Sequence, residues 1–240
     1  MPSYSHIRGI LFDKDGTLID FNRSWFGIIL GLARRSAGGD EARARDLAAE
    51  VGYDWEEARF VGGSVVAAGT MAELVAVWHP ELEPDVLRTR IAEYDLFALE
   101  EGARSAAAIT GLDATLATLR GQGFTLGIAT NDSEAGARAT AAALGIAERF
   151  SAIIGYDSVT QPKPFPDQLH LFARHTGLDA KAIAMVGDNL HDLEMAHAAG
   201  AGLAIGVLSG NSTREQLEEH ADLIIDSIAD LPALFADNRL

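Results

Sequence analysis

Short runs of apolar residues, many of them β-branched, alternate along most of this chain with longer segments of helical periodicity. The helical segments place apolar residues three or four positions apart and end in glycine or a turn cluster. Strands buried under helices on both faces appear in a sequence as continuous apolar runs of this kind. The alternation predicts an α/β fold with a doubly wound parallel sheet, a Rossmann-like core. The expected strands are residues 7–12, 124–130, 152–155, 182–186, 202–207 and 221–225.

The alternation stops after the first expected strand and resumes about 80 residues later. Residues 21–104 instead contain successive amphipathic helical patterns. We therefore predict an all-helical cap domain over 21–104, inserted into a catalytic core made of residues 1–20 and 105–240. Two capping-box patterns also predict helix starts, at Thr70 with Glu73 and at Ser212 with Glu215.

Composition excludes several classes of function. The 240 residues include 35 acidic and 19 basic side chains, for a net charge of -16, which argues against nucleic-acid and anionic membrane partners. Cysteine is absent, so disulfides, thiolate nucleophiles and cysteine-ligated zinc are excluded. No apolar run approaches membrane-spanning length, and the first ten residues do not resemble a signal peptide. We expect a cytoplasmic protein that is a monomer or a homodimer.

Ligands of open α/β sheets bind beyond the carboxyl ends of the strands, and the first such end carries two aspartates. Asp13 and Asp15 follow the apolar run, and side chains two positions apart in an extended chain point the same way. Two carboxylates this close require a cation, and Mg²⁺ suits hard oxygen ligands. A surface turn in "DKDGT" would explain the same residues equally well.

Three later strand ends also carry polar residues. Thr130 and Asn131 follow the second expected strand, where they could bind an anion or cap a helix. Lys163 lies between two prolines in "QPKPFPD", which hold its backbone extended and present its ammonium group rigidly. Asp188 ends the fourth strand and could complete a metal site, with Asp192 four residues later. Together the four ends supply the groups that an active site needs.

These residues resemble the four motifs of the haloacid dehalogenase superfamily in order and spacing. The motif residues are Asp13, Lys14, Asp15, Gly16 and Thr17, then Thr130 and Asn131, then Lys163, and then Gly187, Asp188 and Asp192. The stretch "FDKDGTLID" is most similar to members that resemble phosphoglycolate phosphatases. The cap is similar to that superfamily's only in its position and helical character, so it carries no substrate information. Lys14 departs from the apolar residue that is common between the two aspartates.

The resemblance implies a mechanism that these residue types permit. Asp13 attacks phosphorus and forms an aspartyl-phosphate, while Asp15 protonates the leaving alcohol and then activates water. Thr130, Asn131 and Lys163 bind the phosphoryl group. The resemblance places Mg²⁺ on the side chains of Asp13 and Asp188 and on the backbone carbonyl of Asp15. Gly16, Thr17, Gly187 and Asp192 have supporting roles.

We expect a Mg²⁺-dependent phosphatase acting on a small phosphorylated metabolite, and two alternatives stay open. A sugar phosphomutase would share the fold, although the histidine that such enzymes tend to carry on the first cap helix is replaced by Trp25. A non-catalytic regulator could also retain every motif residue. Dehalogenation is disfavoured by Asp15, and Schiff-base chemistry by a cap without lysine. Arg23, Trp25, Arg59 and the turn 61–64 are weaker candidates for cap residues near the substrate.

Overall fold

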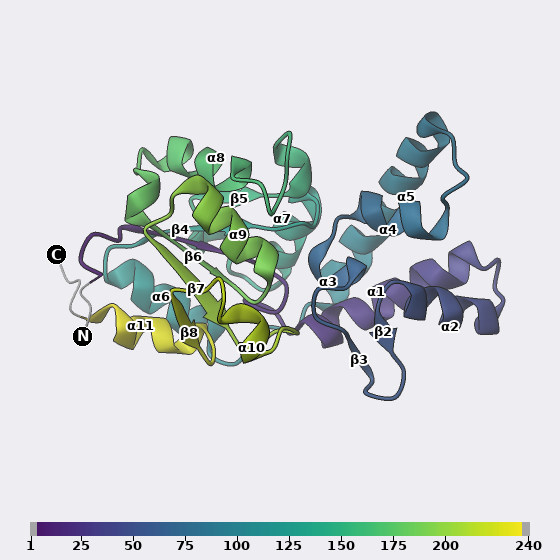
Figure 1. Cartoon of the computed structure of the whole chain (residues 1–240), viewed down its shortest axis with the longest axis horizontal. Helices are drawn as coiled ribbons and strands as arrows, with labels where there is room; N and C mark the ends of the chain where they lie inside the picture. Colours follow the sequence, from purple (N-terminus) through teal and green to yellow (C-terminus); the bar gives the residue numbers. More distant parts are fainter. Residues whose placement is uncertain (1–3, 237–240) are drawn as a thin grey trace.

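The computed structural model describes residues 4–236 and contains a six-stranded parallel sheet in the order β5-β4-β1-β6-β7-β8 (Figure 1). Strand β1 lies at the centre, paired in parallel with β4 and β6. The doubly wound α/β fold is confirmed, and each strand lies within an expected run or one residue beyond it. The strands are β1 (Gly9–Phe12), β4 (Thr125–Ala129), β5 (Ala152–Ile154), β6 (Ile183–Gly187), β7 (Leu203–Val207) and β8 (Leu223–Ile225).

Helices cover both faces of this sheet and bury the apolar strands between them. One face packs against α6 (Leu112–Gly121), α7 (Glu134–Ala143) and α11 (Leu231–Leu234). The other packs against α8 (Asp167–Thr176), α9 (Leu190–Ala199) and α10 (Arg214–Leu217). Full burial of one large apolar side chain contributes about 1.5–3 kcal/mol, so these two layers are the main source of stability in the core. Short 3₁₀ turns join the elements: η1 (Ala147–Arg149), η2 (Tyr156–Ser158), η3 (Ala180–Ala182) and η4 (Ile228–Asp230).

The segment between β1 and α6 forms a separate lobe, which we call the cap (Figure 1). It has its own hydrophobic core, which includes Leu32, Leu47 and Val75, all at most 3% exposed. None of the helices in residues 4–236 combines the length and hydropathy that crossing a bilayer requires. The cap helices are α1 (Phe21–Ser36), α2 (Glu41–Glu50), α3 (Val65–Ala68), α4 (Met71–Trp78) and α5 (Pro84–Ser105).

The cap also contains a small antiparallel hairpin, which the prediction of an all-helical cap did not include. Strands β2 (Tyr53–Asp54) and β3 (Arg59–Phe60) pair across a turn in which Asp54 accepts hydrogen bonds from the amides of Glu56 and Glu57. Strands of two residues are too short to show an alternating pattern, so nothing in the sequence indicated them.

Two predicted helix starts have different outcomes. Thr70 and Glu73 form the expected capping box at the start of α4. The prediction at Ser212 is wrong by one residue, because Thr213 caps α10 and pairs with Gln216. Both hydroxyl residues satisfy the same cap pattern, and only the course of the chain decides between them.

Helix α5 packs against α1 and α4 in the cap and against α7 in the core, so it links the two lobes. The division into a cap of 21–104 and a core of 1–20 and 105–240 stays a prediction. Residues 1–3 and 237–240 of that predicted core lie outside the described residues.

Candidate active site

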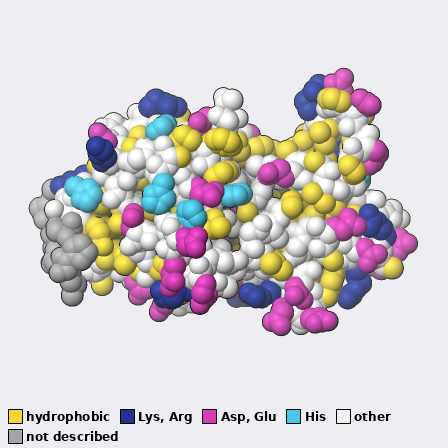
Figure 2. Space-filling view, viewed as in Figure 1, with side chains coloured by type: hydrophobic (Ala, Val, Ile, Leu, Met, Phe, Trp, Pro, Cys, Tyr) yellow, Lys and Arg dark blue, Asp and Glu magenta, His cyan; other side chains and the backbone are white. Residues whose placement is uncertain are grey.

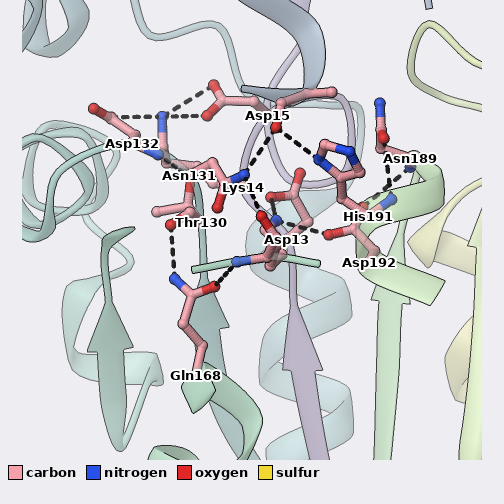
Figure 3. A network of polar contacts seen from close by, with 12 residues as sticks. Asp13, Lys14, Asp15, Thr130, Asn131, Asp132, Gln168, Asn189, His191 and Asp192 are labelled. Carbon is pink, nitrogen blue, oxygen red and sulfur yellow. Dashed lines mark hydrogen bonds and ion pairs between the residues drawn. The ribbon is translucent and has the colours of Figure 1, made fainter. Parts of the chain in front are cut away.

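The sheet brings the predicted strand ends together (Figure 3). Asp13 follows β1, Thr130 follows β4 and Asp188 follows β6, which are three adjacent strands. The amide of Asp13 continues the ladder by donating to the carbonyl of Val186 at 2.8 Å. Asp13, Thr130, Lys163 and Asp188 are all buried, between 1% and 7% exposed. Parallel pairing places Asp13, Thr130 and Asp188 at one edge of the sheet. Lys163 lies in the loop before α8, and the side chains of Asn131 and Gln168 hold its backbone there.

Three buried carboxylates form a tight cluster at this edge. Asp13, Asp188 and Asp192 each offer an oxygen, and these oxygens lie within 4.8 Å of one another. Lys163 Nζ donates to Asp13 Oδ1 at 2.6 Å and to Asp192 Oδ1 at 2.7 Å. One ammonium group therefore compensates three carboxylates, which leaves surplus negative charge in a buried place.

This surplus is reflected in the pKa values. Burial raises the pKa of Asp13 to about 7, opposed by the charge of Lys163 and reinforced by Asp192 and Asp15. Burial and the neighbouring Asp13 and Asp192 also raise the pKa of Asp188 well above its ordinary value. The pKa of Lys163 is lowered by burial, but its two carboxylate partners outweigh burial and raise it above its ordinary value.

The donor set fits a divalent cation such as Mg²⁺. It consists of clustered hard oxygen ligands whose charge the protein does not neutralise. Asp192, predicted only in a supporting role, belongs to this cluster, because its position three residues after the cap residue Asn189 turns its carboxylate back toward the strand ends. The carboxylate of Asp15 is not part of the cluster, and metal binding by its backbone carbonyl stays a prediction.

Two predicted supporting glycines make room for these carboxylates. Gly16 has φ +87°, and a Cβ there would lie 2.6 Å from the carboxylate of Asp188. A Cβ on Gly187 would overlap the carboxylate of Asp192. Asp188 Oδ2 also accepts a hydrogen bond from the amide of Asn211 at 3.0 Å. Thr17 is fully buried, and its hydroxyl has no hydrogen-bond partner within the described residues.

Lys14 is buried beside the site and forms two ion pairs. Its Nζ lies 2.8 Å from Asp15 Oδ2 and 3.1 Å from Asp132 Oδ2 (Figure 3). Burial lowers the pKa of Lys14, but the two carboxylates outweigh burial and raise it above its ordinary value. Burial raises the pKa of Asp132 in turn, against the opposing charge of Lys14. Asp132 was not a sequence candidate, although its place directly after Thr130 and Asn131 was a usable signal.

Thr130 and Asn131 use their side chains differently from a helix cap, since α7 is capped by Ser133. The hydroxyl of Thr130 accepts from the amide of Asp132 at 3.1 Å. Asn131 Nδ2 donates to the carbonyls of Ala68 and Lys163 at 2.8 and 3.1 Å. Their binding of a phosphoryl group stays a prediction.

Gln168 connects Thr130, which follows β4, to Lys163. It was not among the residues predicted from the sequence. It is fully buried, donates to the carbonyl of Thr130 at 2.8 Å and accepts from the amide of Lys163 at 3.3 Å. A buried glutamine in the first turn of a helix has no distinctive pattern, so only the folded structure identifies it.

The cap reaches the site through a few specific contacts. The carbonyl of Ala68 accepts from Asn131 and also contacts His191 Nδ1 at 3.1 Å. Asn22 Nδ2 donates to Asn211 Oδ1 at 2.8 Å, next to the amide that contacts Asp188. His191 is half-buried, with Ala68 against its ring.

Among the weaker cap candidates, Trp25 alone lines the pocket. Trp25 is buried, lines the pocket above Asp13 and donates from Nε1 to Asp15 Oδ1 at 2.5 Å. Arg23 and Arg59 are exposed and do not line that pocket. The turn 61–64 packs at Gly62 against the backbone of Asn211, where a Cβ would lie 2.6 Å from its carbonyl oxygen, and does not reach the pocket.

A parallel α/β sheet with a buried aspartate cluster and a lysine at the ends of its central strands, under an inserted cap, defines a class of hydrolase. The sequence pattern of the haloacid dehalogenase-like hydrolases matches residues 7–200. The chain belongs to this family.

Curated relatives and solved structures agree with this assignment. A protein of Dickeya dadantii named probable phosphatase IndB is 31% identical over 225 residues, covering 92% of this chain and 90% of the relative. A phosphoglycolate phosphatase of Yersinia pseudotuberculosis is 31% identical over 236 residues, covering 98% of this chain and 96% of the relative. The structure of a predicted phosphoglycolate phosphatase from Haemophilus somnus has a TM-score of 0.73 at 23% identity, covering 95% of this chain and 98% of that one. Both curated relatives carry the name phosphatase, and the family identifies the chain as a hydrolase.

Proposed function

We propose that this chain hydrolyses the phosphate monoester of a small metabolite through an aspartyl-phosphate on Asp13, with Mg²⁺ as cofactor. The observation that carries the proposal is the contact of 2.6 Å between Asp13 and Lys163, inside a cluster of three carboxylates. Lys163 orients one oxygen of Asp13 and places a positive charge where the phosphoryl group would be transferred.

The reaction would take place in two steps. A carboxylate oxygen of Asp13 attacks phosphorus, and the bond from phosphorus to the ester oxygen breaks as Asp15 supplies a proton to that oxygen. Asp15 then takes a proton from a water molecule that attacks the aspartyl-phosphate, which releases phosphate and restores Asp13. The hydroxyl of Thr130 and the backbone amide of Asn131 would donate to the phosphoryl oxygens, because the side-chain Nδ2 of Asn131 already donates to two carbonyls.

Asp13, Asp188 and Asp192 are the side chains that would hold the cation, with the backbone carbonyl of Asp15 as a further ligand. The cation would supply charge neutralisation for the transferring phosphoryl group. It would also explain why three buried carboxylates are tolerated with a single lysine.

The test is phosphate release from a panel of phosphorylated metabolites with Mg²⁺, for the wild type and Asp13→Asn. An amide cannot act as the nucleophile, so we expect turnover to fall at least about 10³-fold with the fold intact. Asp113→Asn, at an exposed carboxylate that pairs with Arg149 at 2.8 Å, is the matched control and should retain activity. Full turnover in Asp13→Asn, or in excess chelator, would contradict the nucleophile or the metal, respectively.

A further inference from the structure

A pocket of about 600 Å³, including the solvent at its mouth, lies between the cap and the strand ends. Asp13 forms part of its floor. The opposite wall comes from the cap and consists of the rings of Phe21 and Trp25 and of residues 65–71. Apart from Thr70, that segment contains only apolar side chains and glycine. With phosphorus at Asp13, the rest of the substrate would face this wall.

The residues that line the pocket include no lysine or arginine that is free to pair with a second anionic group of the substrate. Lys163 is the only lysine or arginine among the residues that line it, all of which are described, and its Nζ is bonded to Asp13 and Asp192. His191 donates Nδ1–H to the carbonyl of Ala68, so in the neutral imidazole its Nε2 is an acceptor and offers an anion neither charge nor donor. A second carboxylate or phosphate would therefore be buried without a partner, which is strongly unfavourable.

The charge around the pocket has the same sign as the cluster within it. Asp and Glu side chains are spread over both lobes of the face shown in Figure 2, and the chain carries a net charge of -16. This field adds to the cost of bringing a polyanion into the pocket.

Asn131 lines the pocket and has an unused hydrogen-bond acceptor. Its Nδ2 donates to two carbonyls, of Ala68 and Lys163, and carbonyls only accept, so the orientation of the amide is fixed. Its Oδ1 is buried and has no partner within residues 4–236. A buried acceptor is unfavourable until a ligand supplies a donor, so a hydroxyl or N–H of the substrate fits here.

We propose that the leaving group of the substrate is uncharged. Its apolar part would lie against residues 65–71, and a hydroxyl or N–H would donate to Asn131 Oδ1. This inference rests on the proposed phosphatase function and narrows its substrate class. It distinguishes the chain from the relatives named phosphoglycolate phosphatase, because the leaving group of 2-phosphoglycolate carries a carboxylate.

The test compares 2-hydroxyethyl phosphate with 2-phosphoglycolate, which differ by a hydroxymethyl group in place of a carboxylate. We expect kcat/KM to be at least about tenfold higher for the neutral ester, because the carboxylate has no partner in the pocket. Ethyl phosphate, which lacks the donor, should fall below 2-hydroxyethyl phosphate. Turnover of p-nitrophenyl phosphate would show that the enzyme is an active phosphatase. If such an enzyme does not prefer 2-hydroxyethyl phosphate, or prefers 2-phosphoglycolate, the inference about the leaving group is wrong while the phosphatase function stands. Failure of every ester counts against the phosphatase function itself.

A cap variant tests the missing cation directly. Ala67→Lys places an ammonium group on the cap wall, and Ala67→Met adds a side chain of similar length without charge. We expect Ala67→Lys, and not Ala67→Met, to raise the ratio of kcat/KM for 2-phosphoglycolate to that for 2-hydroxyethyl phosphate about tenfold. Equal ratios in the two variants, with both folded by circular dichroism, would contradict the role of charge.

Discussion

The indole Nε1 of Trp25, on the first cap helix, donates to Oδ1 of Asp15 at 2.5 Å. Lys14 holds the other oxygen of the same carboxylate at 2.8 Å. The proposed general acid is thus fixed from two sides, by a core residue next to it in the chain and by the cap. Because an indole N–H can only donate, Trp25 can orient Asp15 without competing for its proton.

Loss of this hydrogen bond should slow catalysis more than it weakens binding. Trp25→Phe keeps an aromatic ring stacked on Phe21 and removes only the N–H donor. A hydrogen bond to a charged group contributes about 1.5–3 kcal/mol, so we expect kcat to fall at least about tenfold with a change in KM below about threefold. Steady-state kinetics would measure both values.

Trp78 provides the matched control for this variant. It is also a buried cap tryptophan, but its Nε1 donates to the carbonyl of Leu47 and it does not line the pocket. Trp78→Phe should lower stability and leave kcat within about twofold, because its hydrogen bond is structural. A similar loss of kcat in both variants would show that the effect of Trp25 is general to the cap.

Lys14 should matter for stability because it compensates two carboxylates, of Asp15 and Asp132, whose side chains are only 12% and 9% exposed. Lys14→Met leaves Asp15 and Asp132 close together without a cation, and breaking a buried pair costs about 3–5 kcal/mol. Urea denaturation should show a loss of this size, largely recovered in the double variant Lys14→Met with Asp132→Leu. Lys181 is exposed and serves as the control, so Lys181→Met should change the free energy of unfolding by less than about 0.5 kcal/mol. No recovery in the double variant would contradict this account.

The contact between Asp95 in the cap and Tyr156 in the core should make stability depend on pH. Tyr156 donates to Asp95 Oδ2 at 2.6 Å. Burial raises the pKa of Asp95 from 3.8 to about 6, opposed by this hydrogen bond and reinforced by Asp132 and Asp157. Since the folded-state pKa is the higher one, folding favours the protonated form. The contribution of Asp95 is therefore fully present below about pH 4 and is lost as the pH rises through about 6.

Asp95→Asn removes this dependence because the amide stays neutral at every pH. We expect wild type and variant to be equally stable near pH 4, and the variant to be more stable at pH 7.5 by on the order of 1–2 kcal/mol, since partial exposure screens the effect. Thermal unfolding at both pH values would measure the difference. Glu93→Gln, an exposed carboxylate on the same helix, is the control. A variant that is less stable than wild type at pH 7.5 would contradict the prediction.

The groups at the strand ends could be predicted because each follows an apolar run and the sheet fixes where such ends meet. Asp13, Thr130 and Asp188 are of this kind, since they directly follow β1, β4 and β6. Parallel pairing alone brings them to one edge, whatever the cap does. The same argument does not say which way a side chain points, so the burial of Lys14 between two carboxylates could not be predicted.

The contributions of the cap could not be predicted, because they depend on how two lobes dock. The carbonyl of Ala68 contacts the site without any side-chain signal in the sequence. The sequence favoured a place for Trp25 in the cap core over one near the substrate, and the structure places it in the cap core and in the lining of the pocket. Two contacts within the core also lack a sequence signal: the side chain of Gln168 donates to the carbonyl of Thr130, and the amide of Asn211 donates to Asp188 Oδ2.

A phosphatase and a sugar phosphomutase share every step up to the aspartyl-phosphate on Asp13 and differ in the acceptor of the phosphoryl group. A mutase must exclude water and return the group to a sugar hydroxyl, whereas a phosphatase lets Asp15 activate water once the alcohol has left. Trp25 occupies the cap position beside Asp15 and offers no basic nitrogen that could deprotonate a second hydroxyl.

We therefore expect one phosphate released per substrate consumed, with no requirement for a sugar bisphosphate activator. Asp15→Asn should slow both formation and hydrolysis of the phospho-enzyme by about 10²–10⁴-fold, because one carboxyl group serves both steps. Rapid-quench measurements of the phospho-enzyme would separate the two rates. Isomerisation of a hexose phosphate with free phosphate at background would contradict the choice of water as acceptor, while leaving the aspartyl-phosphate on Asp13 intact.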